Sequence, residues 1–186
     1  AGDAPHGRRA IVAGVTGAGA AREVIVLPRV DGPGHVTFAD HLLCALEQEL
    51  GLAPGAIGLE AQIETASGLV NAEAIASACP RRMEALVFGP GDLAASLGMP
   101  HTAIGAPVPG YPGDGWQHVL GRILVAARAG GLQAIDGPYA VIADERGLVA
   151  AAERSRALGY DGKWSIHPSQ IAVLDREIGR RAKEDE

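Results

Sequence analysis

Short aliphatic runs alternate with helix-like stretches along almost the whole chain of 186 residues. The aliphatic runs lie at residues 23–28, 57–63, 85–88, 133–135 and 163–166. Between them, apolar residues recur at helical spacing over residues 36–50, 68–78, 116–129 and 145–158. A last helix is expected to begin at Pro168 or Ser169. This alternation predicts an α/β fold, with parallel strands joined by right-handed helical crossovers.

Five such units are fewer than a closed (β/α)8 barrel contains, because that fold typically takes about 250 residues. We therefore expect either an open sheet or an incomplete barrel. A sheet of this kind has open edges, which favour association, so a homo-oligomer or a partner subunit is expected. The expected organisation is a poorly defined segment at 1–21 with one further strand at 10–15, a domain at 22–178 and a charged tail at 179–186.

The composition limits the class of protein. Hydrophobic residues make up 47% and charged residues 20%, which is typical of a folded globular domain. The net charge of −6 offers no basic footprint for nucleic acid. No apolar run has the length of a membrane span and no signal peptide pattern is present, so a cytoplasmic location is expected. Cys44 and Cys79 are too widely spaced for a typical zinc motif, and a disulfide framework is not expected.

Two carboxylates follow neighbouring strands. Glu64 comes directly after the run at 57–63, and Asp92 follows the run at 85–88. The carboxyl ends of parallel strands meet at one edge of the sheet, where ligands of such folds bind. Two carboxylates suit Mg²⁺, with water and substrate oxygens completing its coordination. The alternative is that both residues simply cap the helices that follow them.

Other polar groups fall at strand ends too. Gly89, Pro90 and Gly91 precede Asp92, and this segment is either a backbone cradle for an anion or an ordinary turn. Asp136 is a candidate for proton transfer, for support of the metal ligands or for a turn. His167 is a candidate general base, although a structural role is the simpler interpretation.

A glycine-rich stretch near the start of the chain bears a weak likeness to a dinucleotide-binding loop. The glycines at positions 14, 17 and 19 follow an aliphatic run at 10–12. Arg22 occupies the place where the third glycine of the pattern would stand, and no P-loop lysine is present. Nucleotide binding is therefore the weakest of the alternatives.

Four ordered motifs carry a family resemblance. They are LEAQIETA at 59–66, VFGPGDLA at 87–94, AIDGPY at 134–139 and GKWSIHP at 162–168, and VLPRV at 26–30 also fits. Together they resemble the HpcH/HpaI aldolase and citrate lyase beta-subunit family over about residues 22–178. The likeness is greatest to its CoA-ester lyases, such as malyl-CoA or citramalyl-CoA lyases.

The resemblance implies a (β/α)8 TIM-barrel fold and a Mg²⁺-dependent carbon–carbon lyase. It implies that Glu64 and Asp92 bind the metal and take part in catalysis and substrate binding. Asp136, from its place at a strand end, is the third catalytic candidate. The backbone of Gly89, Pro90, Gly91 and Asp92 would lie against the carboxylate of an oxo acid. A β-hydroxyacyl-CoA would be cleaved to an acyl-CoA and that oxo acid, with the metal polarising the carbonyl group that forms.

Two elements of the family pattern have no match in these motifs. They are the arginine on an early barrel strand that grips the substrate carboxylate, and the aspartate of a C-terminal lid segment. Asp136, His167 and Asp175 are the candidates for the missing proton transfer. The alternatives to a lyase are a non-catalytic or partner-dependent remnant of the fold and an acyl-CoA thioesterase.

Overall fold

The structure is a computed structural model that describes residues 24–99, 104–106, 108 and 110–179. Its centre is a five-stranded sheet in the order β1-β2-β3-β4-β5, with every neighbouring pair parallel. The strands are β1 (Val24–Leu27), β2 (Gly58–Ile63), β3 (Met83–Phe88), β4 (Gln133–Asp136) and β5 (Gly162–Lys163). The strand order follows the chain order, as it does in a β/α barrel, but within the described residues β1 and β5 remain the two edges. The expectation of an incomplete barrel of about five units is thus confirmed for this part of the chain.

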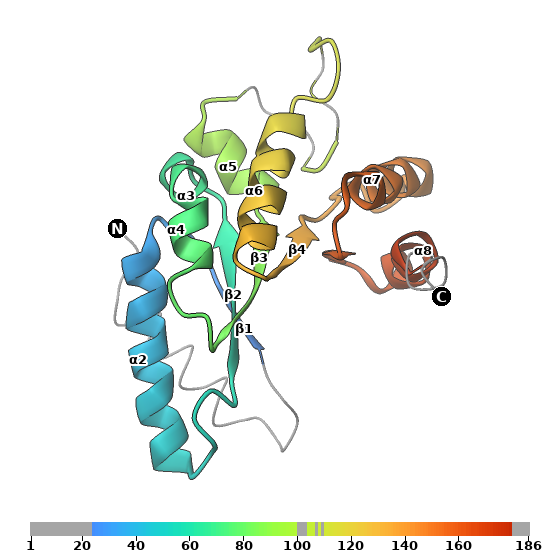
Figure 1. Ribbon diagram of the computed structural model, residues 1–186. Helices are drawn as coiled ribbons and strands as arrows, with labels where there is room; N and C mark the ends of the chain where they lie inside the picture. Colours follow the sequence, from blue (N-terminus) through green and yellow to red (C-terminus); the bar gives the residue numbers. More distant parts are fainter. Residues whose placement is uncertain (1–23, 100–103, 107, 109, 180–186) are drawn as a thin grey trace.

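Helices follow the strands and cover the sheet (Figure 1). They are α2 (Pro33–Leu50), α3 (Ala66–Val70), α4 (Ala72–Ala76), α5 (Pro90–Ser96), α6 (Gln117–Ala129), α7 (Glu145–Leu158) and α8 (Pro168–Ile178). Figure 1 shows α2, α4 and α6 along the sheet and α7 beside α8 beyond β4. The main core lies between the sheet and its helices, and it includes Leu43, Ile75, Leu86 and Ile123.

The ends of several helices follow directly from the sequence. Gly51 adopts a left-handed conformation (φ 68°) and ends α2, as glycine does at many helix C-termini. Asp144 caps α7 by accepting a hydrogen bond from the Gly147 N–H at 3.0 Å. The predicted helix over 145–158 is therefore confirmed at both of its ends.

Two elements differ from the predicted pattern. The single helix expected over 68–78 is divided at Asn71, because the Arg122 guanidinium takes the Leu69 and Val70 carbonyls that would continue the helix. The strand expected over 163–166 is reduced to Gly162–Lys163, because the Ile166 N–H turns away to donate to the Gln170 side chain.

Residues 1–23, 100–103, 107, 109 and 180–186 lie outside the described part of the chain. The strand expected at 10–15, the glycine-rich stretch that begins at residue 14 and the charged tail fall on these residues. Within the described residues, no helix is both long enough and apolar enough to cross a membrane.

Candidate active site

The two predicted carboxylates lie at the carboxyl ends of adjacent strands. Glu64 directly follows β2, and Asp92 lies in the first turn of α5, which begins just after β3. Ile63 pairs with Phe88 in the parallel register of these strands, so the two strand ends are level. The sheet therefore brings Glu64 and Asp92 to one edge, as the sequence predicted.

Glu64 is held in a largely buried position with 6% of its surface exposed. Its Oε1 accepts a hydrogen bond from the Arg29 main-chain N–H at 2.8 Å. Burial raises the pKa of Glu64, the negative charge of Asp92 raises it further, and the hydrogen bond and charge of Arg29 oppose the rise. The two carboxylates are thus close enough to repel each other, which is the electrostatic setting that favours a bound cation.

Arg29 is a functional candidate to which the sequence pattern assigned no role. It follows β1 by two residues, after Pro28 has ended the strand. Its Nη1 lies 3.3 Å from Asp92 Oδ2, while its main chain contacts Glu64. A basic residue at the end of the first strand was the available signal, but only the fold shows that it meets residues 35 and 63 positions away.

Gly89 makes room for Glu64. A Cβ atom on Gly89 would come within 2.5 Å of Glu64 Cβ and 2.8 Å of Glu64 Oε2, so no side chain fits here without movement. The Gly89 N–H donates to the Ile63 carbonyl at 3.0 Å, which keeps the two strand ends together. The segment that the sequence offered as an anion cradle or an ordinary turn begins α5, with Gly89 as N-cap and Pro90 in its first turn.

The alternative interpretation is that Glu64 and Asp92 only cap the helices that follow them, and the structure gives a different answer for each residue. Thr65, and not Glu64, caps α3, because its Oγ1 accepts from the Gly68 N–H at 3.0 Å. Asp92 does lie in the first turn of α5, where a negative charge is favourable. Its ion pair with Arg29 shows that it also takes part in the cluster at the strand ends.

The donor set fits a hard divalent cation. Glu64 and Asp92 supply carboxylate oxygens from two strand ends, and the described residues contain no cluster of three or more His, Cys, Asp or Glu side chains placed for a metal. Mg²⁺ is usually held by one or two carboxylates while water and substrate oxygens complete its coordination. The fit rests on the oxygen chemistry of this pair and on the space that Gly89 leaves beside Glu64.

Asp136 lies at the end of β4 in a separate buried cluster. Its Oδ2 is 2.6 Å from Lys163 Nζ and also accepts from Ser155 Oγ, while its Oδ1 accepts from the Gly137 N–H at 2.7 Å. Arg154 approaches the same carboxylate at 3.6 Å. These are contacts of a residue that anchors the end of β4, and a role for Asp136 in proton transfer stays a prediction.

The two remaining proton-transfer candidates lie at the last helix. His167 is the N-cap of α8, where its Nδ1 accepts from the Ser169 N–H at 3.2 Å. This is the structural role that the sequence favoured for His167. Asp175 lies in the second half of α8, and its role in proton transfer stays a prediction.

Comparison with known proteins decides the family. The family model for HpcH/HpaI aldolase/citrate lyase matches residues 5–168, which is most of the chain. This chain belongs to that family. The family resemblance read from the four motifs is thereby confirmed, and with it the barrel-type fold class.

Individual relatives agree with this assignment. An L-malyl-CoA/beta-methylmalyl-CoA lyase of Cereibacter sphaeroides is 35% identical over 182 residues, which cover 93% of this chain and 57% of that protein. A citrate lyase structure from Burkholderia xenovorans superimposes with a TM-score of 0.83 at 26% identity, covering 98% of this chain and 57% of the other. The protein CitE of Mycobacterium tuberculosis, solved in complex with magnesium and pyruvate, gives a TM-score of 0.70 at 31% identity, with 95% and 64% covered.

The family member described here thus spans just over half the length of the curated lyase that it matches. The stretch that matches the family model includes the strand ends that carry Glu64 and Asp92.

Proposed function

We propose that residues 22–178 form the lyase domain of a Mg²⁺-dependent carbon–carbon lyase. The substrate would be a β-hydroxyacyl-CoA of the malyl-CoA, citramalyl-CoA or citryl-CoA type, and the products an acyl-CoA and an oxo acid. The observation that carries the proposal is the Glu64 and Asp92 pair, held at level strand ends in a chain of the HpcH/HpaI family. Relatives named as malyl-CoA lyases, and a neighbour solved with magnesium and pyruvate, support it.

In this proposal Glu64 and Asp92 hold the metal through their carboxylates. Mg²⁺, when bound, supplies a Lewis acid that polarises the carbonyl group formed as the carbon–carbon bond breaks. Gly89 lies beside Glu64, and the main chain of Gly89, Pro90 and Gly91 is proposed to contact the oxo-acid carboxylate. The Arg29 N–H fixes the orientation of Glu64 before any ligand arrives.

We also propose that the working form is an oligomer or a complex with a partner subunit in the cytoplasm. The described part of the sheet has β1 and β5 as unpaired edges, and such edges favour association. The alternative is a remnant of the fold that keeps the metal pair and is inactive without a partner.

An assay with a small substrate panel tests the proposal. Purified protein with Mg²⁺ is given malyl-CoA, methylmalyl-CoA, citramalyl-CoA and citryl-CoA, and the release of glyoxylate, pyruvate or oxaloacetate is followed with and without EDTA. Release that EDTA abolishes supports the lyase. Free CoA without cleavage of the carbon chain would identify a thioesterase instead, and Mg²⁺ binding without any turnover would favour the remnant.

A further inference from the structure

Arg29 connects the two carboxylates of the site by two different groups. Its main-chain N–H donates to Glu64 Oε1 at 2.8 Å, and its Nη1 donates to Asp92 Oδ2 at 3.3 Å. The main-chain bond fixes a buried carboxylate, whereas the guanidinium reaches an exposed one. The side chain of Arg29 is therefore free to serve a purpose other than holding Glu64.

The backbone of Arg29 is held in an unfavourable conformation. Its φ of 52° lies in the left-handed region, which non-glycine residues seldom adopt, and among the described residues Arg29 is the non-glycine residue found there. The hydrogen bond to Glu64 and the one from the Val30 N–H to the Gln62 carbonyl, at 3.4 Å, fix this turn. This turn leads the chain past the carboxylate cluster at the strand ends.

The ion pair between Arg29 and Asp92 contributes little to the stability of the fold. The two side chains are 63% and 54% exposed, and exposed pairs of this kind add little to stability. A guanidinium carries five N–H donors in a planar fork that matches a carboxylate. Among the described residues, the Arg29 guanidinium donates a hydrogen bond to Asp92. Most of its N–H donors therefore remain available to a ligand.

We propose that the Arg29 guanidinium is a binding group for the carboxylate of a small 2-oxo acid. This inference rests on the proposed function, because the oxo acid is the product that function assigns to the site. A carboxylate placed beside Glu64 and Asp92 has the same charge as both. The Arg29 guanidinium next to Asp92 supplies a positive charge, in addition to that of the metal, which offsets this repulsion.

The charge of Arg29 has opposite consequences for the two ligands. A guanidinium next to Asp92 attracts an anion but repels a cation. Removal of this charge should therefore weaken oxo-acid binding and should not weaken Mg²⁺ binding. A merely structural role would affect both ligands in the same direction, because a disturbed site binds both less well.

The test is calorimetric titration of wild type, Arg29→Gln and Arg29→Lys, first with Mg²⁺ and then, at saturating Mg²⁺, with pyruvate. Pyruvamide, which has no carboxylate, is the neutral probe. In Arg29→Gln we expect pyruvate affinity to fall about tenfold, the scale of one charge-assisted hydrogen bond, with little change for pyruvamide. Mg²⁺ affinity should stay equal or rise. The pyruvate affinity of Arg29→Lys should lie between those of wild type and Arg29→Gln, because lysine keeps the charge but lacks the planar guanidinium.

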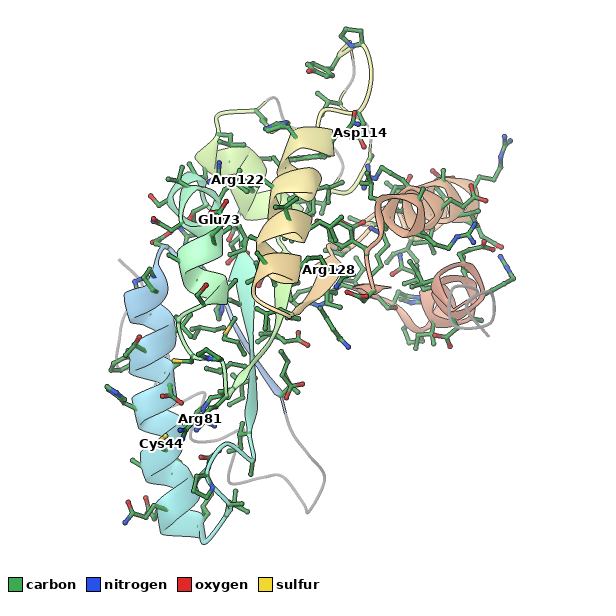
Figure 2. The ribbon with its side chains drawn as sticks, viewed as in Figure 1. Cys44, Glu73, Arg81, Asp114, Arg122 and Arg128 are labelled. Carbon is green, nitrogen blue, oxygen red and sulfur yellow. The ribbon has the colours of Figure 1, made fainter. Side chains whose placement is uncertain are left out.

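Arg122→Gln is the matched control. Arg122 on α6 forms an ion pair with Glu73 on α4 at the same 3.3 Å, with 45% and 53% exposure, and both residues are labelled in Figure 2. Loss of this surface charge should leave the affinities for Mg²⁺, pyruvate and pyruvamide unchanged.

Three results would overturn the inference. Equal pyruvate affinity in wild type and Arg29→Gln would show that Arg29 does not bind the carboxylate. Loss of Mg²⁺ and pyruvate binding together would show that Arg29 only supports the metal pair. A wild-type protein that binds no Mg²⁺ would overturn the proposed function as well, and this result is distinct from the other two.

Discussion

The Lys163 ammonium and the Asp136 carboxylate meet at 2.6 Å between strands β5 and β4, with each side chain only 1% exposed. Lys163 also donates to the Gly137 carbonyl at 2.7 Å. Gly137 packs so closely on Pro90 that a Cβ there would lie 2.3 Å from Pro90 Cδ. The buried pair therefore supports the segment that leads into Asp92.

Lys163→Met should destabilise the protein by about 3–5 kcal/mol, because it leaves the Asp136 carboxylate buried without its ammonium partner. Chemical denaturation at pH 7 measures this loss. The double variant Lys163→Met with Asp136→Asn should be less destabilised than Lys163→Met alone. A single variant within about 1 kcal/mol of wild type would show that the pair carries little energy.

Gly89→Ala should weaken Mg²⁺ binding and lower any lyase activity by about 10- to 100-fold, since a displacement of about 1 Å at a site has effects of this size. The reason is the contact of the new methyl group with Glu64 at 2.5–2.8 Å. Gly121→Ala is the matched control. Gly121 lies within α6, and an added Cβ would meet no atom within 4 Å beyond the neighbouring backbone of that helix. This change should therefore add up to about 1 kcal/mol of stability and leave the Mg²⁺ affinity unchanged. If Gly89→Ala binds Mg²⁺ as tightly as Gly121→Ala does, the placement of Glu64 in the metal site is contradicted.

Glu47 provides a pH-dependent contribution to stability. Burial acts to raise its pKa, but hydrogen bonds from Arg82, Ile57 and Gly55 outweigh burial and lower the pKa of Glu47 from 4.5 to about 2. A carboxyl whose pKa is lower in the folded state stabilises the protein above its unfolded pKa. This contribution is lost as the pH falls from about 5 towards 2.

Glu47→Gln should therefore be about 3 kcal/mol less stable than wild type at pH 7. This difference in the free energy of unfolding should become smaller as the pH is lowered towards 2. Urea denaturation over this pH range is the measurement. Glu49→Gln, at an exposed position on the same helix, serves as the control and should show little loss at pH 7. If the difference in the free energy of unfolding between wild type and Glu47→Gln does not change with pH, the carboxylate charge of Glu47 is not what stabilises the fold.

Local patterns in the sequence predicted most of the fold. The helix at 145–158 was predictable because its cap and its terminal glycine lie within the same stretch of chain. The division of the helix at Asn71 was not, because Arg122 reaches its carbonyls from about 50 residues away. Contacts over such distances leave no trace in hydrophobic periodicity.

The candidate site was predictable for a similar reason and to a similar extent. Glu64 and Asp92 follow apolar runs, and parallel strand ends necessarily meet at one edge. Arg29 and the partners of Asp136 could not be predicted in this way. Their contacts depend on a left-handed turn after β1 and on the packing of β5 beside β4, which only the assembled sheet defines.

The central claim is that Glu64 and Asp92 hold Mg²⁺, and calorimetric titration of Mg²⁺ into wild type, Glu64→Gln and Asp92→Asn tests it most directly. Each variant keeps the shape of the side chain and removes one negative charge. The account predicts measurable Mg²⁺ binding by wild type and at least about tenfold weaker binding by each folded variant, since each change removes a direct ligand. Wild-type affinity in both variants would contradict the metal site.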